Sequence, residues 1–510
     1  EDTLQSTKIN ISGIYDPIDN DLKIDMWSKS DGKLILDIFN KLAKKELSKD
    51  ANEILNILFL TNSYFPQRNI SYDEFVKIKM DWLIKNNDHE LIENYLQINQ
   101  KPNDNLNLIK FLIDSYLSKS ELKKSCNVFS KIDEVINDDY VSNFKIYCLI
   151  NEEKREEAQL LFDIKKELGF ENEFFENKFN YLMGYDTEIN KSISEKNILD
   201  FHLSHKVNQE FNFEPNQSTS KIIWQYLSSS NLLDNVNDID LENLEKINLI
   251  EKATHEKNYS EKELFKLYKR FQFNINQLLT VKDSYKLLPD IQARALLYQG
   301  ILITSEPKLR LDLIKTLKDN FIKKEIGNAF KKEMIRILEE IEVEDVPSNY
   351  TTFYNKYTSD KKENLNKIKI NNKIIHQSKL LNYLKKQNQN KNIEKDINDF
   401  LKKIKKDKDY YFSLKDVILL ETFKSDGIML QKKYQEMYEV IDPNIPNDIQ
   451  EFIDNDETSM VLLRIAEIIG EDKFENMDPD TLYFIISSLN KLNIDSLRNR
   501  FLLKVLPLKV

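Results

Sequence analysis

Apolar residues follow the spacing of one helix face along most of the chain, as the segment LIKFLIDSYLSKSELKKSCNVFSKI at residues 108–132 illustrates. Its two parts, residues 108–118 and 121–132, each carry apolar residues three or four positions apart, with polar residues between them. This spacing predicts two amphipathic helices. Because only two residues separate them, we expect the pair to form a helical hairpin.

The hairpin pattern repeats with a period of 33 residues. Nine apolar or small positions align in three successive hairpins: Leu83, Tyr116 and Leu149 in the first helix, and Ile92, Ser125, Ala158, Leu96, Phe129 and Phe162 in the second. One hairpin cannot bury its own apolar face, so this repeat predicts hairpins that stack into an α-solenoid. The period blurs beyond Gly184.

The spacing within each hairpin resembles that of the tetratricopeptide repeat. In that family an aromatic residue on the first helix precedes a small residue on the second by nine positions, and a bulky aromatic follows four positions later. Tyr116, Ser125 and Phe129 match this pattern, and the next hairpin repeats it with a leucine in the first place. The family's glycine is replaced by Ile113 and Ile146, and its terminal proline is absent. The resemblance is therefore to a degenerate repeat over roughly residues 40–185.

A broader resemblance rests on the order of segments along the chain. The run IDMWSKSDGKLILDIFNKL is followed by LFLTNSYFP, then by the hairpins, and then by SHKV before WQYLSSSNLL. This order is similar to that in an uncharacterised family of exported helical-repeat proteins of alphaproteobacteria. The resemblance implies export and an all-helical fold, and it brings no site residues with it.

Helical patterns continue to the end of the chain, so the sequence predicts an all-α fold: an α-solenoid of TPR-like hairpins with a C-terminal helical domain. The expected segments are an N-terminal extension (1–30), TPR-like repeats (31–190), a continued repeat region (191–345), lysine-rich connector and helices (346–410) and a C-terminal helical domain (411–510).

Local signals predict several helix starts. Ser71 with Glu74, and Ser260 with Glu263, have capping-box spacing. Asp478 is expected to be an N-cap with a proline at the first helical position. The apolar end of the chain, LRNRFLLKVLPLKV, is expected to dock into its own domain, with a partner-binding tail as the alternative.

Glycine is scarce, and this narrows the function classes. Only 8 glycines occur in 510 residues, where average usage would give roughly 36. Phosphate-binding loops and hairpin turns depend on glycine. The sequence therefore argues against a dinucleotide fold or a β-sandwich.

Charge is negative overall but unevenly distributed. The formal net charge of −11 argues against general binding to nucleic acid or anionic lipid. Residues 355–410, however, hold 16 lysines against 7 acidic residues. Tyr383, Tyr410 and Tyr411 offer rings for base stacking. Residues 361–409 are thus a candidate nucleic-acid or anionic-surface patch, although solvated amphipathic helices are the preferred interpretation.

The two cysteines, Cys126 and Cys148, are expected on neighbouring helices beside core positions. Buried free thiols, which behave as small hydrophobic groups, are the commoner arrangement and the preferred interpretation. A disulfide is the alternative for an exported protein, and it requires Cα atoms within about 7 Å.

His202 and His205 lie three residues apart, a spacing that allows two imidazoles to share a metal. No third ligand is evident nearby, so exposed or capping histidines are preferred. We therefore expect no metal site and no cofactor.

Motifs for nucleophilic, phosphate-binding or zinc-dependent catalysis are absent from the sequence. The acidic runs DNDLKIDMW and DNDET lack the glycine and the final glutamate of a calcium loop. A cell-wall lytic enzyme with a solenoid scaffold is the enzymatic alternative, but Glu421 is followed by Thr422 and not by the serine typical of that group.

The sequence thus predicts a non-enzymatic scaffold or adaptor that binds a protein partner or self-associates. No run of 18 apolar residues exists, so we expect no membrane span. The chain begins EDTLQSTK without methionine, which fits either a removed tag or a cleaved signal peptide. A periplasmic or exported location is expected, with the cytoplasm as the alternative.

Overall fold

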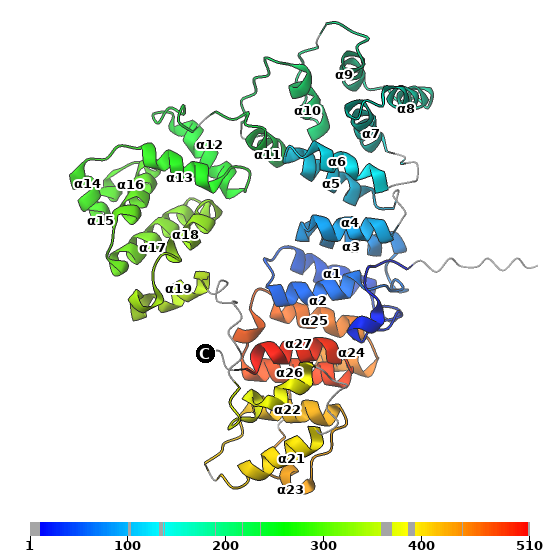
Figure 1. Ribbon diagram of the computed structural model, residues 1–510, viewed down its shortest axis with the longest axis vertical. Coiled ribbons are helices and arrows are strands. Elements are labelled where there is room, and N and C mark those ends of the chain that lie inside the picture. The colour runs from blue at the N-terminus through cyan, green and yellow to red at the C-terminus, as the bar shows by residue number, and fades with distance from the viewer. Residues whose placement is uncertain are drawn as a thin grey trace, which may run out of the picture. The chain divides into compact units, whose positions relative to one another are not determined.

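The computed structural model describes residues 11–99, 104–131, 136, 138–188, 190–216, 218–234, 236–358, 370–385, 393–407, 409–440 and 442–507. In these ranges the secondary structure consists of α-helices and short 3-10 helices (Figure 1). Three isolated backbone bridges also occur, all between residues 12 and 68. The predicted all-α class is confirmed. None of the helices in these ranges is long and apolar enough to cross a lipid bilayer.

The chain forms two compact units, one from Glu1–Leu108 with Leu365–Val510 and the other from Ile109–Asn364. The first unit contains α1 (Gly32–Ala43), α2 (Lys49–Leu60), α3 (Tyr72–Asn86), α4 (His89–Ile98), α20 (Asn382–Lys385), α21 (Ile393–Ile404), α22 (Leu414–Ser425), α23 (Lys432–Gln435), α24 (Asn447–Asp454), α25 (Thr458–Ile469), α26 (Pro479–Lys491) and α27 (Asp495–Val505).

The second unit contains α5 (Leu106–Ser118, which starts at the junction), α6 (Leu122–Asn127), α7 (Asp139–Asn151), α8 (Arg155–Glu167), α9 (Glu173–Met183), α10 (Ile198–Val207), α11 (Lys221–Ser229), α12 (Leu244–His255), α13 (Glu261–Arg270), α14 (Ile275–Leu279), α15 (Val281–Ser284), α16 (Asp290–Ile303), α17 (Pro307–Lys323), α18 (Lys331–Leu338) and α19 (Thr351–Thr358).

Helix boundaries follow the 33-residue period. The second helices of three successive hairpins, α4, α6 and α8, begin at His89, Leu122 and Arg155, which are 33 residues apart. After α9 the next helix starts only at Ile198, so the period ends where the sequence pattern blurs.

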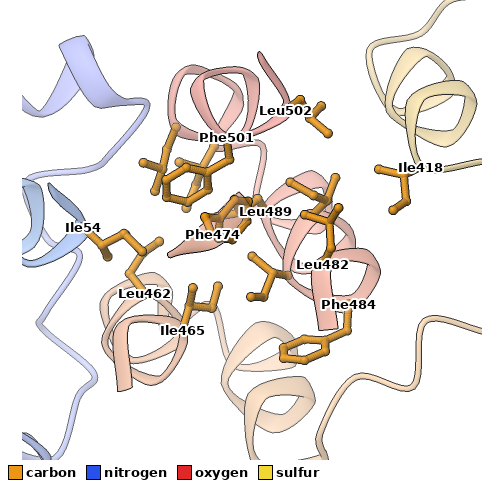
Figure 2. Close-up of a cluster of buried hydrophobic side chains, with 14 of the residues drawn as sticks. Ile54, Ile418, Leu462, Ile465, Phe474, Leu482, Phe484, Leu489, Phe501 and Leu502 are labelled. Carbon is orange, nitrogen blue, oxygen red and sulfur yellow. The ribbon is translucent and has the colours of Figure 1, made fainter. Parts of the chain in front are cut away.

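Both ends of the chain build the core of the first unit. Helix α2 packs along α25, and α1 contacts both α25 and α3. Figure 2 shows Ile54 of α2 facing Leu462 of α25, with Phe474 and Phe501 beside them. The rings of Phe474 and Phe501 lie 4.4 Å apart between centroids.

Polar contacts fix the same packing. Lys504 of α27 donates to the carboxylates of Asp50 and Glu53 on α2, at 2.8 Å each. The C-terminal residues up to 507 therefore dock into the body of the protein, as expected. Residues 411–507 do not stand apart as a domain, however, because their apolar faces are covered by α1 and α2. The consecutive boundaries expected from the sequence do not follow this division of the chain.

Capping agrees with the sequence at two of three positions. Ser71 and Glu74 form the reciprocal capping box at α3, and Asp478 accepts a hydrogen bond from the backbone of Thr481 at α26. Ser260 makes no side-chain capping bond at α13, so that prediction was wrong.

Glu263, the expected partner of Ser260, accepts a hydrogen bond from Lys266 at 2.7 Å instead, and Glu261 at the start of the same helix has a different role. Glu261 directs its carboxylate to the backbone amides of Lys332 and Glu333 at the start of α18. A residue in the first turn of α13 thus caps the N-terminus of α18.

Candidate functional site

The repeat positions serve packing. Seven of the nine side chains are buried, and Leu96 and Leu149 are half-buried. Ser125 donates its hydroxyl to the carbonyl of Ile113 at 2.8 Å, which ties α6 closely to α5. These positions hold the hairpins together and present no ligand-binding set.

Helix α8 has an exposed apolar row. Ala158 and Phe162 point inward, and Phe162 stacks on Phe179 at 4.2 Å between ring centroids. The other face carries Leu160, Ile164 and Leu168, spaced four residues apart and 62%, 44% and 83% exposed. We call these three residues the α8 apolar row. Exposed apolar patches on soluble proteins mark interaction surfaces.

The cysteines are bonded to each other. Cys126 of α6 and Cys148 of α7 form a disulfide with Cα atoms 5.5 Å apart. The preferred expectation of free buried thiols was wrong, because packing of α7 against α6 brings the two sulfur atoms together. Disulfides persist in oxidising compartments and are rare in the cytosol.

His202 is buried, in contrast to the expectation of exposed or capping histidines. Its Nε2 and Nδ1 atoms lie 2.8 Å from the hydroxyls of Tyr147 and Tyr226, and His205 Nδ1 lies 2.7 Å from that of Tyr226. Burial, with smaller contributions from nearby cations, lowers the pKa of His202 to about 3. A neutral ring held by two hydroxyls is a packing group. Across the described chain no three His, Cys, Asp or Glu side chains gather as a metal site would require.

A second buried histidine, which sequence reasoning missed, lies in the first unit. His376 Nδ1 lies 2.7 Å from Asp416 Oδ1 and 3.4 Å from the Ser413 hydroxyl. In a Ser-His-Asp triad the serine and the aspartate face opposite ring nitrogens, whereas here both face Nδ1 and Gln377 lies at Nε2. The cluster anchors residues 375–377 to the start of α22. The only sequence signal was the capping-box spacing of Ser413 and Asp416, which is realised.

The lysine-rich stretch is amphipathic where it is described, with apolar residues in the core and its lysines exposed. Residues 361–369, 386–392 and 408 lie outside the described ranges. Helix α21 buries Ile397 and Leu401 while its lysines face outward. Tyr383 is buried against Phe423.

Only one of the three tyrosines proposed for base stacking is open to solvent. Tyr410 donates its hydroxyl to Asp416 at 3.1 Å, whereas Tyr411 is 87% exposed. The ring pair required for a stacking platform is therefore not formed by these residues.

Glu421, the residue considered for cell-wall cleavage, is engaged. It accepts hydrogen bonds from Lys424 Nζ at 2.7 Å and from the Tyr438 hydroxyl at 3.0 Å. The geometry gives Glu421 a structural role.

The second unit contains a cavity of about 710 Å³, which we call the basic cavity. Its walls come from the end of α12, the start of α13, the start of α18 and part of α11. Six cationic residues line it: Lys119, Lys257, Lys262, Lys331, Lys332 and Arg336. Two carboxylates, Glu261 and Glu333, also line it, so positive charge dominates in a chain whose net charge is −11.

Both carboxylates of the basic cavity are already committed. Glu261 accepts from two backbone amides at 2.9 and 3.0 Å, and burial raises its pKa in spite of these bonds. Glu333 accepts from Arg336 at 2.7 and 2.9 Å and from the Tyr298 hydroxyl at 2.8 Å. Burial opposes its ionisation, but these bonds outweigh burial and lower the pKa of Glu333.

Sequence reasoning did not identify the basic cavity. Most of its residues come from 257–262 and 331–336, and neither stretch carries a recognisable motif. Packing of Phe265 against Phe330, with ring centroids 5.5 Å apart, brings the stretches together. Compared with protein-family models, curated proteins and solved structures, the chain matches none of them.

Proposed function

We propose that this protein is a non-enzymatic helical-repeat scaffold or adaptor that binds a protein partner. The observation that carries the proposal is the α8 apolar row. Stacked hairpins cover one another's apolar faces, but three large apolar side chains along α8 remain in solvent. A partner protein would supply the missing cover.

We propose a non-enzymatic role because the two polar clusters around His376 and Glu421 make structural contacts. His376, Asp416 and Ser413 have the wrong mutual geometry for acyl transfer, and Glu421 is engaged by two donors. Their contacts tie helices together. This supports a binding role over a catalytic one.

We propose further that the protein works in an exported, oxidising location such as the periplasm. The support is the disulfide between Cys126 and Cys148, together with the resemblance in segment order to exported helical-repeat proteins. The even spacing of the starts of α4, α6 and α8 supports the proposal of tetratricopeptide-like hairpins in such a scaffold.

Site-specific photocrosslinking from position 164 in living cells tests the scaffold proposal. A defined protein adduct that depends on Leu160 and Leu168 supports it. Failure to form an adduct, together with a monomeric sedimentation profile, contradicts it.

A further inference from the structure

The basic cavity has a chemistry that the proposed scaffold role does not use. Lys257 and Lys262 extend from the loop before α13 and from its first turn, and both side chains are exposed at the cavity wall. Of the other four cations on the wall, Arg336 is paired with Glu333 and Glu340, and Lys119, Lys331 and Lys332 add further positive charge. Glu261 is engaged by two backbone amides. Cations that line one cavity attract an anion placed in it, so the lysines of the basic cavity favour a negatively charged ligand.

Helix ends add to the positive potential. The N-terminus of α13, a helix of ten residues, opens on the cavity at Ser260, whose side chain makes no capping bond. A helix N-terminus presents free N–H groups and the positive end of the helix dipole. Phosphate and carboxylate groups bind at such positions. The same interaction occurs at the N-terminus of the neighbouring helix α18, where the carboxylate of Glu261 accepts hydrogen bonds from two backbone amides.

Asn258 brings an unpartnered hydrogen-bond acceptor to the wall of the cavity. This residue is 3% exposed and lines the cavity. Its Nδ2 donates to Glu256 at 3.0 Å, whereas its buried Oδ1 has no partner. Leaving a buried acceptor unsatisfied costs about 1–3 kcal/mol. A ligand hydroxyl would remove that penalty, and Ser228, Ser229 and Asn328 offer further hydrogen-bonding groups on the wall.

The size of the cavity limits the ligand to a small molecule. Its volume of about 710 Å³ falls within the usual range for small-ligand sites, about 300–1,000 Å³. From the cations, the helix end, the unpartnered amide oxygen and the volume, we propose that the basic cavity binds a small phosphorylated molecule that also carries hydroxyl groups. Sugar phosphates and the headgroups of phosphorylated lipids share this chemistry. The site is independent of the α8 apolar row, so either proposal can fail without the other.

Isothermal titration calorimetry on the full-length chain tests the proposal with four probes: fructose 1,6-bisphosphate, unphosphorylated fructose, pyrophosphate, and vesicles containing phosphatidylinositol phosphate. Binding of the bisphosphate in preference to fructose supports a site for phosphate groups. If only the vesicles bind, the ligand source is a lipid headgroup, which also supports the shared chemistry. If no phosphorylated probe binds, the proposal is overturned.

Charge reversal assigns the binding to the cavity. Lys257→Glu with Lys262→Glu is expected to weaken the bisphosphate by at least about tenfold, which corresponds to about 1.4 kcal/mol. The matched control, Lys315→Glu with Lys323→Glu on α17, makes the same change in net charge at exposed positions outside the cavity. Equal weakening by both pairs would overturn the assignment, because it would show a general charge effect.

Asn258→Ala separates the hydroxyl contact from the phosphate contacts. We expect it to weaken the bisphosphate while leaving pyrophosphate, which has no alcohol hydroxyl, unchanged. Circular dichroism checks that the variant is folded. Equal effects on both probes would overturn the role of the hydroxyl group.

Discussion

Cys126 and Cys148 are joined by a disulfide that links α6 to α7 across 22 positions of sequence. The bond connects the two helices at a place where both contribute buried residues. This covalent link keeps α6 and α7 close together even when their packing is lost. The disulfide therefore leads to one prediction about the free energy of unfolding and another about the cellular compartment.

Reduction of the disulfide is expected to destabilise the second unit. Closing a loop of this length stabilises a fold by about 3 kcal/mol in the chain-entropy description. Urea unfolding of oxidised protein and of the Cys126→Ala, Cys148→Ala variant should therefore show a lower midpoint for the variant. Identical midpoints would contradict the prediction.

The same bond reports the compartment. Alkylation of intact cells, followed by mass spectrometry of the Cys126 and Cys148 peptides, should find both thiols protected until a reductant is added. Complete alkylation without reductant would place the protein in a reducing compartment.

A buried ion pair holds the core of the second unit. Arg294 of α16 contacts Glu251 of α12 at 2.6 and 3.0 Å, and Tyr268 of α13 donates its hydroxyl to the same carboxylate. Removing one partner of a buried pair leaves an uncompensated charge and costs about 3–5 kcal/mol. Arg294→Met should therefore lower stability severely.

Replacing both charges should restore most of the lost stability. In Arg294→Met with Glu251→Leu no charge is left unpaired, and buried pairs replaced by apolar residues are often neutral in stability. Thermal unfolding of the two single variants and the double variant forms a double-mutant cycle. Additive losses would show that the pair does not couple.

Lys79 of α3 makes stability depend on pH. Its side chain is fully buried, and Nζ donates to the carbonyl of Ser12 at 2.6 Å. Burial lowers the pKa of Lys79 to about 7. Between that value and the ordinary lysine pKa of about 10.4, the unfolded chain binds the extra proton and the folded chain does not. Stability therefore rises with pH across this window.

The expected rise attributable to Lys79 is roughly 4 kcal/mol between pH 7 and pH 10. It should disappear in Lys79→Met and persist in Lys77→Met, which removes an exposed lysine from the same helix. Chemical unfolding at a series of pH values measures the slope. A slope in Lys79→Met equal to that of the wild type would show that Lys79 is charged when folded.

The small residues of the repeat keep neighbouring helices close. Ala158 is fully buried on α8, and a larger side chain there must push α7 and α8 apart. Overpacking typically costs about 1–3 kcal/mol, so Ala158→Leu should lower the unfolding midpoint. Glu156→Leu, two residues earlier at an exposed position, is the control and should leave the midpoint nearly unchanged.

Local pattern was enough to predict the all-helical class, because the apolar face of a helix such as α8 is formed by residues three or four positions apart in the sequence. It was not enough to predict the pairing of α2 with α25, since many unrelated apolar faces could cover Ile54 equally well. His202 illustrates the same limit. The sequence shows its spacing from His205. It does not show that Tyr147 of α7 and Tyr226 of α11 pack against the ring and bury it.

Site residues were hardest to predict for the same reason. In the sequence, Lys257 and Lys262 cannot be told from other surface lysines. Only the folded structure shows that α18 places further cations on the same cavity wall. The two cysteines could be placed on adjacent helices, but whether their sulfur atoms met depended on how those helices packed. Sequence spacing gives neighbours along one helix, whereas a cavity is made between helices.

The scaffold role is tested most directly by a photocrosslinking residue placed at position 164, between Leu160 and Leu168 on α8. In cells that produce the native partner, we expect one predominant protein adduct, which mass spectrometry identifies and purified components reproduce. Leu160→Glu with Leu168→Glu should abolish the adduct, and Glu156→Lys should not. An adduct yield at position 164 no higher than at exposed position 315, with no self-association in sedimentation, would contradict the proposed protein-binding function.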